Sequence, residues 1–92
     1  MQGMRENRRM KIRNGKTEYI GTSREARKAL KKMAYLMREC EAEYKASQEA
    51  RKRGDMDAVR HHDHWWGTYL DEAEDYHYLF ANGYAGIRIR FL

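Results

Sequence analysis

The residues best suited to chemistry form one short run, HHDHWW, at positions 61–66. Imidazole and carboxylate groups are common ligands of zinc and other transition metals. Asp57, His61 and His64 follow i, i+4, i+7 spacing, so on a helix they would share one face and are the candidate metal ligands. One helix face supplies at most three ligands, and no fourth is specified. We therefore expect a solvated polar face at these positions, with no metal and no cofactor.

A second candidate is the acidic run DEAED at 71–75, because paired carboxylates can act as general acid and base. A hydrolase would also need a nucleophile or a metal, and the sequence shows neither. Residues 22–53 hold ten cations against five acids, whereas residues 54–83 hold one against seven. We therefore predict that 71–75 neutralise the cations around Lys31, Lys32 and Arg38. We expect no catalysis and no small-molecule substrate.

Two long helices are expected to position these residues. Apolar or small residues recur in alternating steps of three and four, the pattern of a coiled-coil seam. The positions are 26, 30, 33, 37, 40, 44 and 47 in a first helix, 22–53, and 59, 62, 66, 69, 73, 76 and 80 in a second, 55–82. His62 and Trp66 belong to this seam, whereas His61 and His64 face water.

The helix ends also carry local signals. Thr22 followed by Glu25 fits a capping box, Gly54 fits a C-terminal stop, and Asp55 can cap the second helix. Asn82-Gly83 ends that helix. So short a connection predicts an antiparallel helical hairpin about 45 Å long at 1.5 Å per residue.

The chain ends are expected to form a small sheet. Asn14-Gly15 is a type I′ hairpin signal within 10–21, and it predicts a register that places Lys11 opposite Glu18. In that register Met10, Ile12, Thr17 and Tyr19 share a buried face. Residues 84–92 alternate isoleucine or phenylalanine with arginine, which predicts a third strand. The sequence thus predicts a single α+β domain over 1–92, mainly helical, in ββααβ order, with a basic arm at 1–9.

The best candidate binding surface is basic. The net charge is +5 and the pI near 9.5. A stripe on the first helix lies opposite the apolar seam, and it comprises Arg24, Lys28, Lys31, Tyr35 and Arg38. The arm adds Arg8 and Arg9, and the solvent face of the sheet adds Lys11, Arg13, Arg88 and Arg90. Such a surface favours nucleic acid or a nucleic-acid-handling protein as partner, with salt-sensitive affinity.

The aromatic residues indicate a second surface. Trp65 and Trp66 are 100° apart on a helix, so both cannot point into one seam. Trp65, Tyr76 and Tyr78 are therefore candidates for an interface, either with a second copy or with a partner protein.

The sequence also limits the compartment and the class of protein. Cys40 is the only cysteine, and no apolar run approaches the roughly 20 residues that span a bilayer. The N-terminus lacks the apolar core of a signal peptide. We expect a cytoplasmic protein that does not enter a membrane.

The small, charge- and methionine-rich chain resembles accessory proteins of phages and mobile elements, including inhibitors of host defence. We expect a non-enzymatic regulator or inhibitor that binds through its basic face. The alternatives are a homo-oligomeric structural or assembly protein and a metal-dependent enzyme around His61 and His64.

Overall fold

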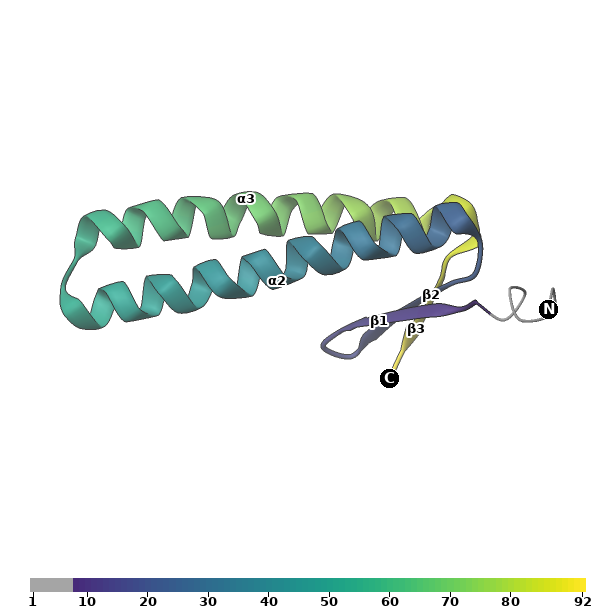
Figure 1. The fold of residues 1–92 in the computed structure, drawn as a ribbon, viewed down its shortest axis with the longest axis horizontal. Helices are drawn as coiled ribbons and strands as arrows, with labels where there is room; N and C mark the ends of the chain where they lie inside the picture. Colours follow the sequence, from purple (N-terminus) through teal and green to yellow (C-terminus); the bar gives the residue numbers. More distant parts are fainter. Residues whose placement is uncertain (1–7) are drawn as a thin grey trace.

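The computed structural model describes residues 8–92, and it confirms the predicted α+β class and ββααβ order (Figure 1). The elements are β1 (Met10–Asn14), β2 (Thr17–Gly21), α2 (Arg24–Arg53), α3 (Met56–Ala81), a 3₁₀ turn (Tyr84–Gly86) and β3 (Arg88–Phe91). The two helices form a long hairpin, and the three strands form an antiparallel sheet in the order β1-β2-β3. Residues 1–7 of the predicted arm lie outside the described residues.

The turn between the helices forms as predicted. Gly54 has φ 76°, a left-handed conformation that glycine adopts at no steric cost, and it ends α2. Asp55 follows at once, and its carboxylate accepts a hydrogen bond of 3.1 Å from the backbone N–H of Ala58. The reversal of direction therefore takes only these residues, and it fixes α2 and α3 as antiparallel neighbours.

The start of α2 differs from the prediction. Ser23, and not Thr22, is the N-cap, because its hydroxyl accepts a 3.0 Å hydrogen bond from the backbone N–H of Ala26. The predicted capping box of Thr22 with Glu25 is therefore wrong by one residue. Ser23 can cap because it retains an extended backbone, with φ −72° and ψ 163°.

The register of the first hairpin also differs. Asn14 pairs with Thr17 and Arg13 pairs with Glu18, so the two turn residues are Gly15 and Lys16. Gly15 has φ 62°, which a two-residue turn that begins with glycine requires. Relative to the prediction the pairing moves by two positions, which leaves every side chain on the expected face. Ile12 and Tyr19 therefore still point towards the helices as a cross-strand pair.

The C-terminal strand is shorter than the predicted 84–92. Gly83 has φ 90° and Ala85 has φ 53°, so the chain makes a tight 3₁₀ turn before it becomes extended. β3 then pairs with β2, with Ile89 opposite Tyr19. The sheet thus joins two segments that stand near opposite ends of the described chain.

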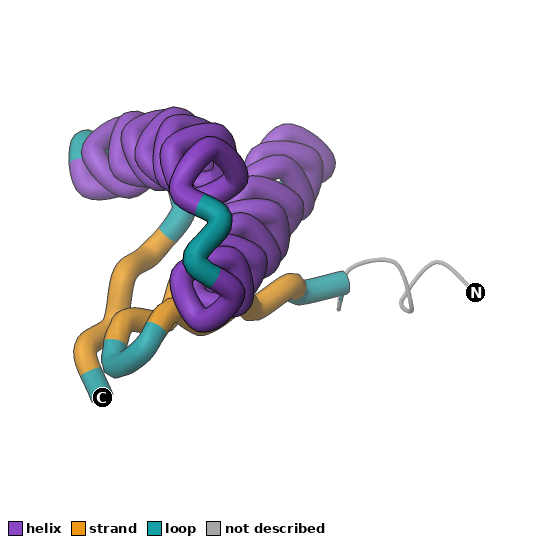
Figure 2. The backbone as a smooth tube through the Cα atoms, turned by 90° about the vertical axis from the view of Figure 1, so that its left-hand side faces the viewer, coloured by secondary structure: helices purple, strands orange, loops and turns teal. Residues whose placement is uncertain are grey.

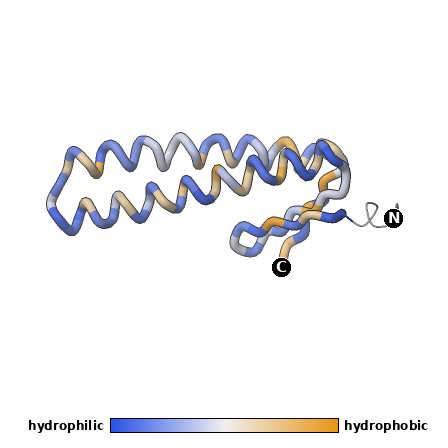
Figure 3. The backbone as a smooth tube through the Cα atoms, viewed as in Figure 1, coloured by the Kyte–Doolittle hydropathy of each residue, from blue (hydrophilic) through white to orange (hydrophobic). Residues whose placement is uncertain are grey.

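The core lies at the open end of the helical hairpin, where the sheet covers one side of both helices (Figure 2). β1 and β2 contact α2, while β3 contacts α3. The buried cluster comprises Tyr19, Ala26, Ala29, Leu30, Met33, Phe80 and Ile87. The half of the hairpin near Gly54 extends beyond the sheet and is mostly hydrophilic (Figures 1 and 3).

The predicted seam is largely confirmed, but it is too narrow. Ala26, Leu30 and Met33 are buried on α2, as are Val59, Ala73 and Phe80 on α3, in agreement with the prediction. Leu36, which lies outside the predicted seam, is also fully buried, whereas the seam residue Tyr44 is half exposed. α2 buries a wider face because it meets α3 on one side and the sheet on another.

Two glycines provide a matched test of this packing. A Cβ at Gly21 would lie 2.7 Å from the Cβ of Ala26, so Gly21→Ala should lower the free energy of unfolding by about 1–3 kcal/mol. A Cβ at Gly67, within α3, would meet no neighbouring atom within 4 Å, so Gly67→Ala should raise it by about 0.5–1 kcal/mol. Chemical denaturation measures both values. Equal effects in the two variants would contradict the close approach of β2 to α2.

Candidate functional site

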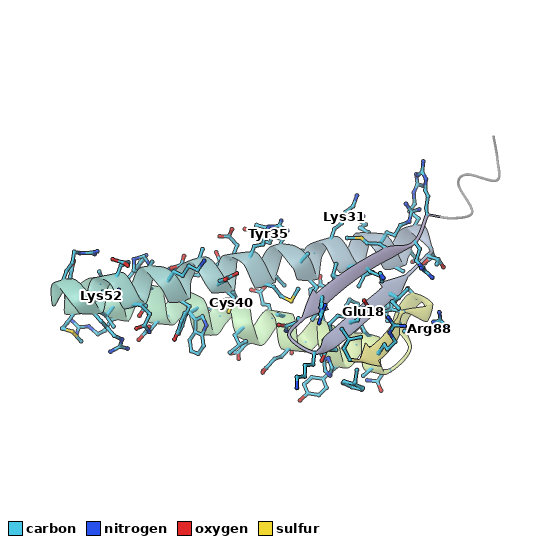
Figure 4. The ribbon with its side chains drawn as sticks, turned by 90° about the horizontal axis from the view of Figure 1, so that it is seen from below. Glu18, Lys31, Tyr35, Cys40, Lys52 and Arg88 are labelled. Carbon is cyan, nitrogen blue, oxygen red and sulfur yellow. The ribbon has the colours of Figure 1, made fainter. Side chains whose placement is uncertain are left out.

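One long edge of the molecule is lined with exposed cations. We call it the basic edge, and it consists of Arg24, Lys28, Lys31, Tyr35 and Arg38 on α2. All of these residues are exposed, and Lys31 and Tyr35 project from the side of α2 that faces away from α3 (Figure 4). The ammonium group of Lys32 lies 5.6 Å from the centre of the Tyr35 ring, a cation–π distance. The predicted stripe is thus a continuous accessible surface.

The predicted neutralisation of these cations by residues 71–75 does not occur. Within residues 8–92, no ion pair joins the acidic run to α2 or involves a cation of the basic edge. The reason is geometric. Ala73 is the buried residue of the run, and Asp71 and Asp75 are each two residues, or about 200°, away from it on the helix. Both carboxylates therefore project from the far edge of α3.

Arg8 and Arg9 extend the basic edge at the open end of the hairpin. Both are exposed, and they directly precede β1. Met10 pairs with Gly21, which stands just before the start of α2. The two arginines are therefore close to the first turn of α2 and to Arg24.

The outer face of the sheet carries cations around one carboxylate. β2 places Glu18 between Arg13 on β1 and Arg90 on β3 (Figure 4). Glu18 is only 7% exposed. Lys11 Nζ lies 3.8 Å from Glu18 Oε2, and Arg90 Nη2 lies 2.8 Å from Glu18 Oε1. The Arg90 contact is an ion pair without the alignment of a hydrogen bond. The predicted Lys11–Glu18 pair therefore forms diagonally, not directly across the strands.

This arrangement makes the sheet a weaker anion surface than the basic edge. Glu18 engages Lys11 and Arg90, whereas Arg13 and Arg88 are exposed and have no ion pair within residues 8–92. Arg13 donates a hydrogen bond of 3.1 Å from Nε to the carbonyl of Gly15, which ties it to the turn.

The HHDHWW run is divided between several environments. His62 Nδ1 lies 2.7 Å from Glu43 Oε1 across the helical hairpin, as expected for a residue of the seam. Asp63 accepts a hydrogen bond of 2.5 Å from the hydroxyl of Ser47, and it forms an ion pair of 3.1 Å with Arg51. These contacts make His62 and Asp63 part of the joint between the helices.

The candidate metal ligands are not brought together. Asp57 pairs with Arg60, while the ring of His64 packs against Trp65. Among residues 8–92, no three histidine, cysteine, aspartate or glutamate side chains are close enough to hold an ion. The i, i+4, i+7 spacing therefore does not produce a chelating cluster.

Two further polar groups, Tyr19 of β2 and Cys40 of the predicted seam, are structural. The hydroxyl of Tyr19 lies 2.7 Å from His77 Nδ1, and burial raises the pKa of Tyr19, so the hydroxyl stays protonated. Burial also raises the pKa of the Cys40 thiol, whose sulfur lies 3.7 Å from the carbonyl oxygen of Trp66.

The aromatic candidates separate onto different faces. Trp65 is 38% exposed and its ring packs against Tyr69, one turn further along α3. Tyr76 lines a groove that contains no strand residue, whereas Tyr78 lines a depression shared with Thr17 and Tyr19 of β2. Trp65 and Tyr76 therefore belong together, and Tyr78 does not. Helical spacing adds Leu79, which the prediction omitted, and Tyr69, which the prediction assigned to the seam with α2.

No family model, curated protein or solved structure matches this chain. Among the described residues, no helix combines the length and apolar character needed to cross a membrane.

Asp63 and Asp71 provide a matched test of the helical joint. In Asp63→Ala the buried Ser47 hydroxyl loses its acceptor, so the free energy of unfolding should fall by about 1–3 kcal/mol. Asp71 is exposed and has no ion pair in the described chain, so Asp71→Ala should change it by less than about 0.5 kcal/mol. Urea denaturation reports both, and a larger loss in Asp71→Ala would refute the assignment.

Proposed function

We propose that the protein is a non-enzymatic binding protein that holds the phosphate backbone of nucleic acid along its basic edge. The observation that carries this proposal is the lack of any acidic partner for these cations within residues 8–92, although an acidic run stands on the neighbouring helix. Cations held apart from the molecule's own acids are available to an external anion.

The electrostatics of the edge suit a polyanion. Successive residues of the edge follow one another every three to four positions, which is about 4.5–6 Å along the axis of a helix, and Tyr35 separates Lys31 from Arg38. Each cation that meets a phosphate releases a condensed counterion, which makes the binding favourable and dependent on salt. Cations near the first turn of α2 are also disfavoured by the helix dipole in the free protein, so a bound anion relieves that cost.

Tyr35 adds a different type of contact. It is 42% exposed among the cations of the edge, and its ring already interacts with Lys32. An exposed aromatic ring beside a phosphate-binding strip can stack on an unpaired base, whatever the identity of that base. Contacts to the backbone carry no sequence information, so we expect binding with little sequence preference.

This mode of binding fits a small regulator or inhibitor. By covering a stretch of backbone, such a protein would exclude other proteins from the same nucleic acid. We place this activity in a reducing cytoplasm, where Cys40 would remain a free thiol.

Lys31→Ala and Lys52→Ala test the proposal, because they remove the same charge from opposite ends of α2 (Figure 4). Binding to fluorescently labelled nucleic acid is measured by anisotropy over a series of salt concentrations. For Lys31→Ala we expect weaker binding, with a salt slope smaller by about one unit. Lys52→Ala, near Gly54, should behave like the unchanged protein.

Two outcomes would contradict the proposal. One is the absence of binding at low ionic strength. The other is an equal loss of affinity in both variants, which would show that only net charge matters and that the basic edge is not the site.

A further inference from the structure

Aromatic and apolar side chains remain uncovered on the side of the helices away from the sheet. We call this surface the aromatic face, and it consists of Trp65, Tyr69, Tyr76 and Leu79 on α3. Trp65 is 38% exposed and Leu79 is 41% exposed. Tyr76 and Leu79 line a groove of about 680 Å³ with Lys28, Lys31, Lys32 and Tyr84, and no residue of the sheet contributes to it.

The spacing of these residues is that of a second helical seam. Residues 65, 69, 72, 76 and 79 follow alternating steps of four and three along α3. α3 already packs on α2 through its first seam, which includes Ala73 and Phe80. A helix with two seams is typical of a bundle in which it has two neighbours. Here residues 8–92 supply no second neighbour.

The charges on α2 beside the aromatic face identify the occupant. Lys28 and Lys32 stand at one end, and Glu39 and Glu43 at the other. The basic end borders this face because both lysines line its groove. The acidic end borders it because Glu39 and Glu43 lie near Tyr69. The pKa of Tyr69 is raised first by desolvation and then by these and other nearby groups, Tyr35 and Glu72. A two-fold axis between residues 35 and 36 would exchange the basic end with the acidic end.

We propose that the aromatic face is the interface of an antiparallel homodimer, a four-helix arrangement in which α2 packs across its own copy. In that register Lys32 faces Glu39 of the partner subunit and Lys28 faces Glu43 of the partner subunit. Because the axis is two-fold, each of these pairs forms twice. The charges that α2 contributes to this surface are thus self-complementary, as an isologous interface requires.

The same axis aligns the aromatic residues of α3. Lys28 and Lys32 of α2 lie beside Tyr76 and Leu79 of α3, and Cys40 lies beside Trp66. Residues 35 and 36, which stand between these positions on α2, therefore lie beside the part of α3 near Glu72, and the axis crosses α3 there. Trp65 then faces the segment that carries Tyr76 and Leu79 in the second copy. Partly exposed aromatic rings at the centre of an interface are frequent binding anchors. Glu72 would meet its own copy near the axis, and Tyr69 would lie beside it.

The dimer would also double the basic edge. An axis that runs across the helices places α2 over α2 and α3 over α3, so both basic edges lie on the same side of the assembly. The two sheets, which cover the opposite side of each hairpin, would remain on the outside (Figure 2).

A charge swap tests the interface in the absence of nucleic acid. Light scattering and sedimentation equilibrium of the unchanged protein should show a dimer. Lys32→Glu and Glu39→Lys should each raise the dissociation constant at least about tenfold, because like charges then face each other across the interface. The double variant should restore dimerisation, since the same pairs form with their signs exchanged.

Lys52→Glu is the matched control, because the same change of charge falls on α2 near Gly54, outside the groove that Lys28 and Lys32 line. It should leave the dimer intact. Circular dichroism and thermal melts establish that each variant is folded, and the double variant keeps the test decisive if one single variant is unstable.

A monomer at every concentration would overturn the proposal and leave the face to a different partner. Failure of the double variant to recover would overturn the register. The dimer is tested without nucleic acid, and the basic edge is tested with Lys31→Ala and nucleic acid. Failure of the dimer and failure of the proposed function are therefore distinguishable, although Lys28 belongs to both surfaces.

Discussion

The close approach of β2 to the start of α2 constrains the rest of the structure. Gly21 lies so near Ala26 and Leu30 that a Cβ would not fit, and only Thr22 and Ser23 separate the strand from the helix. The sheet must therefore fold back under α2 at once, and Tyr19 is buried against His77 and Phe80 of α3. The same contact places β1, with Arg8 and Arg9 before it, beside the first turn of α2.

The consequence is a molecule with four different sides. The sheet covers one side of the helical hairpin, and the aromatic face remains open on the other. The edge of α2 is basic, whereas the far edge of α3 carries Asp71 and Asp75 because the small Ala73 occupies the contact with α2. The acidic run and the cations of the basic edge are thereby separated in space, and this separation leaves both available to external partners.

Local signals in the sequence predicted the elements well, whereas contacts between elements were harder to predict. Gly54, Asp55 and the alternating seam fix the helical hairpin through short-range geometry; the two turn residues were confirmed, and the seam was largely confirmed. The hairpin register was wrong because Asn14-Gly15 and Gly15-Lys16 are both acceptable turns, and the choice depends on the pairing of β2 with β3 and on the packing of Gly21.

The candidate binding residues of α2 were found to be exposed, as expected. Their lack of acidic partners within residues 8–92 depends on the orientation of residues 71–75, which the charge balance of the two halves of the chain does not reveal. The second seam of α3 was missed because the candidates were Trp65, Tyr76 and Tyr78, while Tyr69 was assigned to the seam with α2 and Leu79 was left out.

The central claim is that unpaired cations on one edge of α2 bind nucleic acid, and that a two-fold axis brings two such edges together. The most direct measurement is the mass of the complex formed with a short nucleic acid, obtained by native mass spectrometry. We predict complexes with two protein chains on one nucleic acid molecule. A complex of one chain with one nucleic acid molecule, at concentrations where the protein alone is dimeric, would contradict the claim.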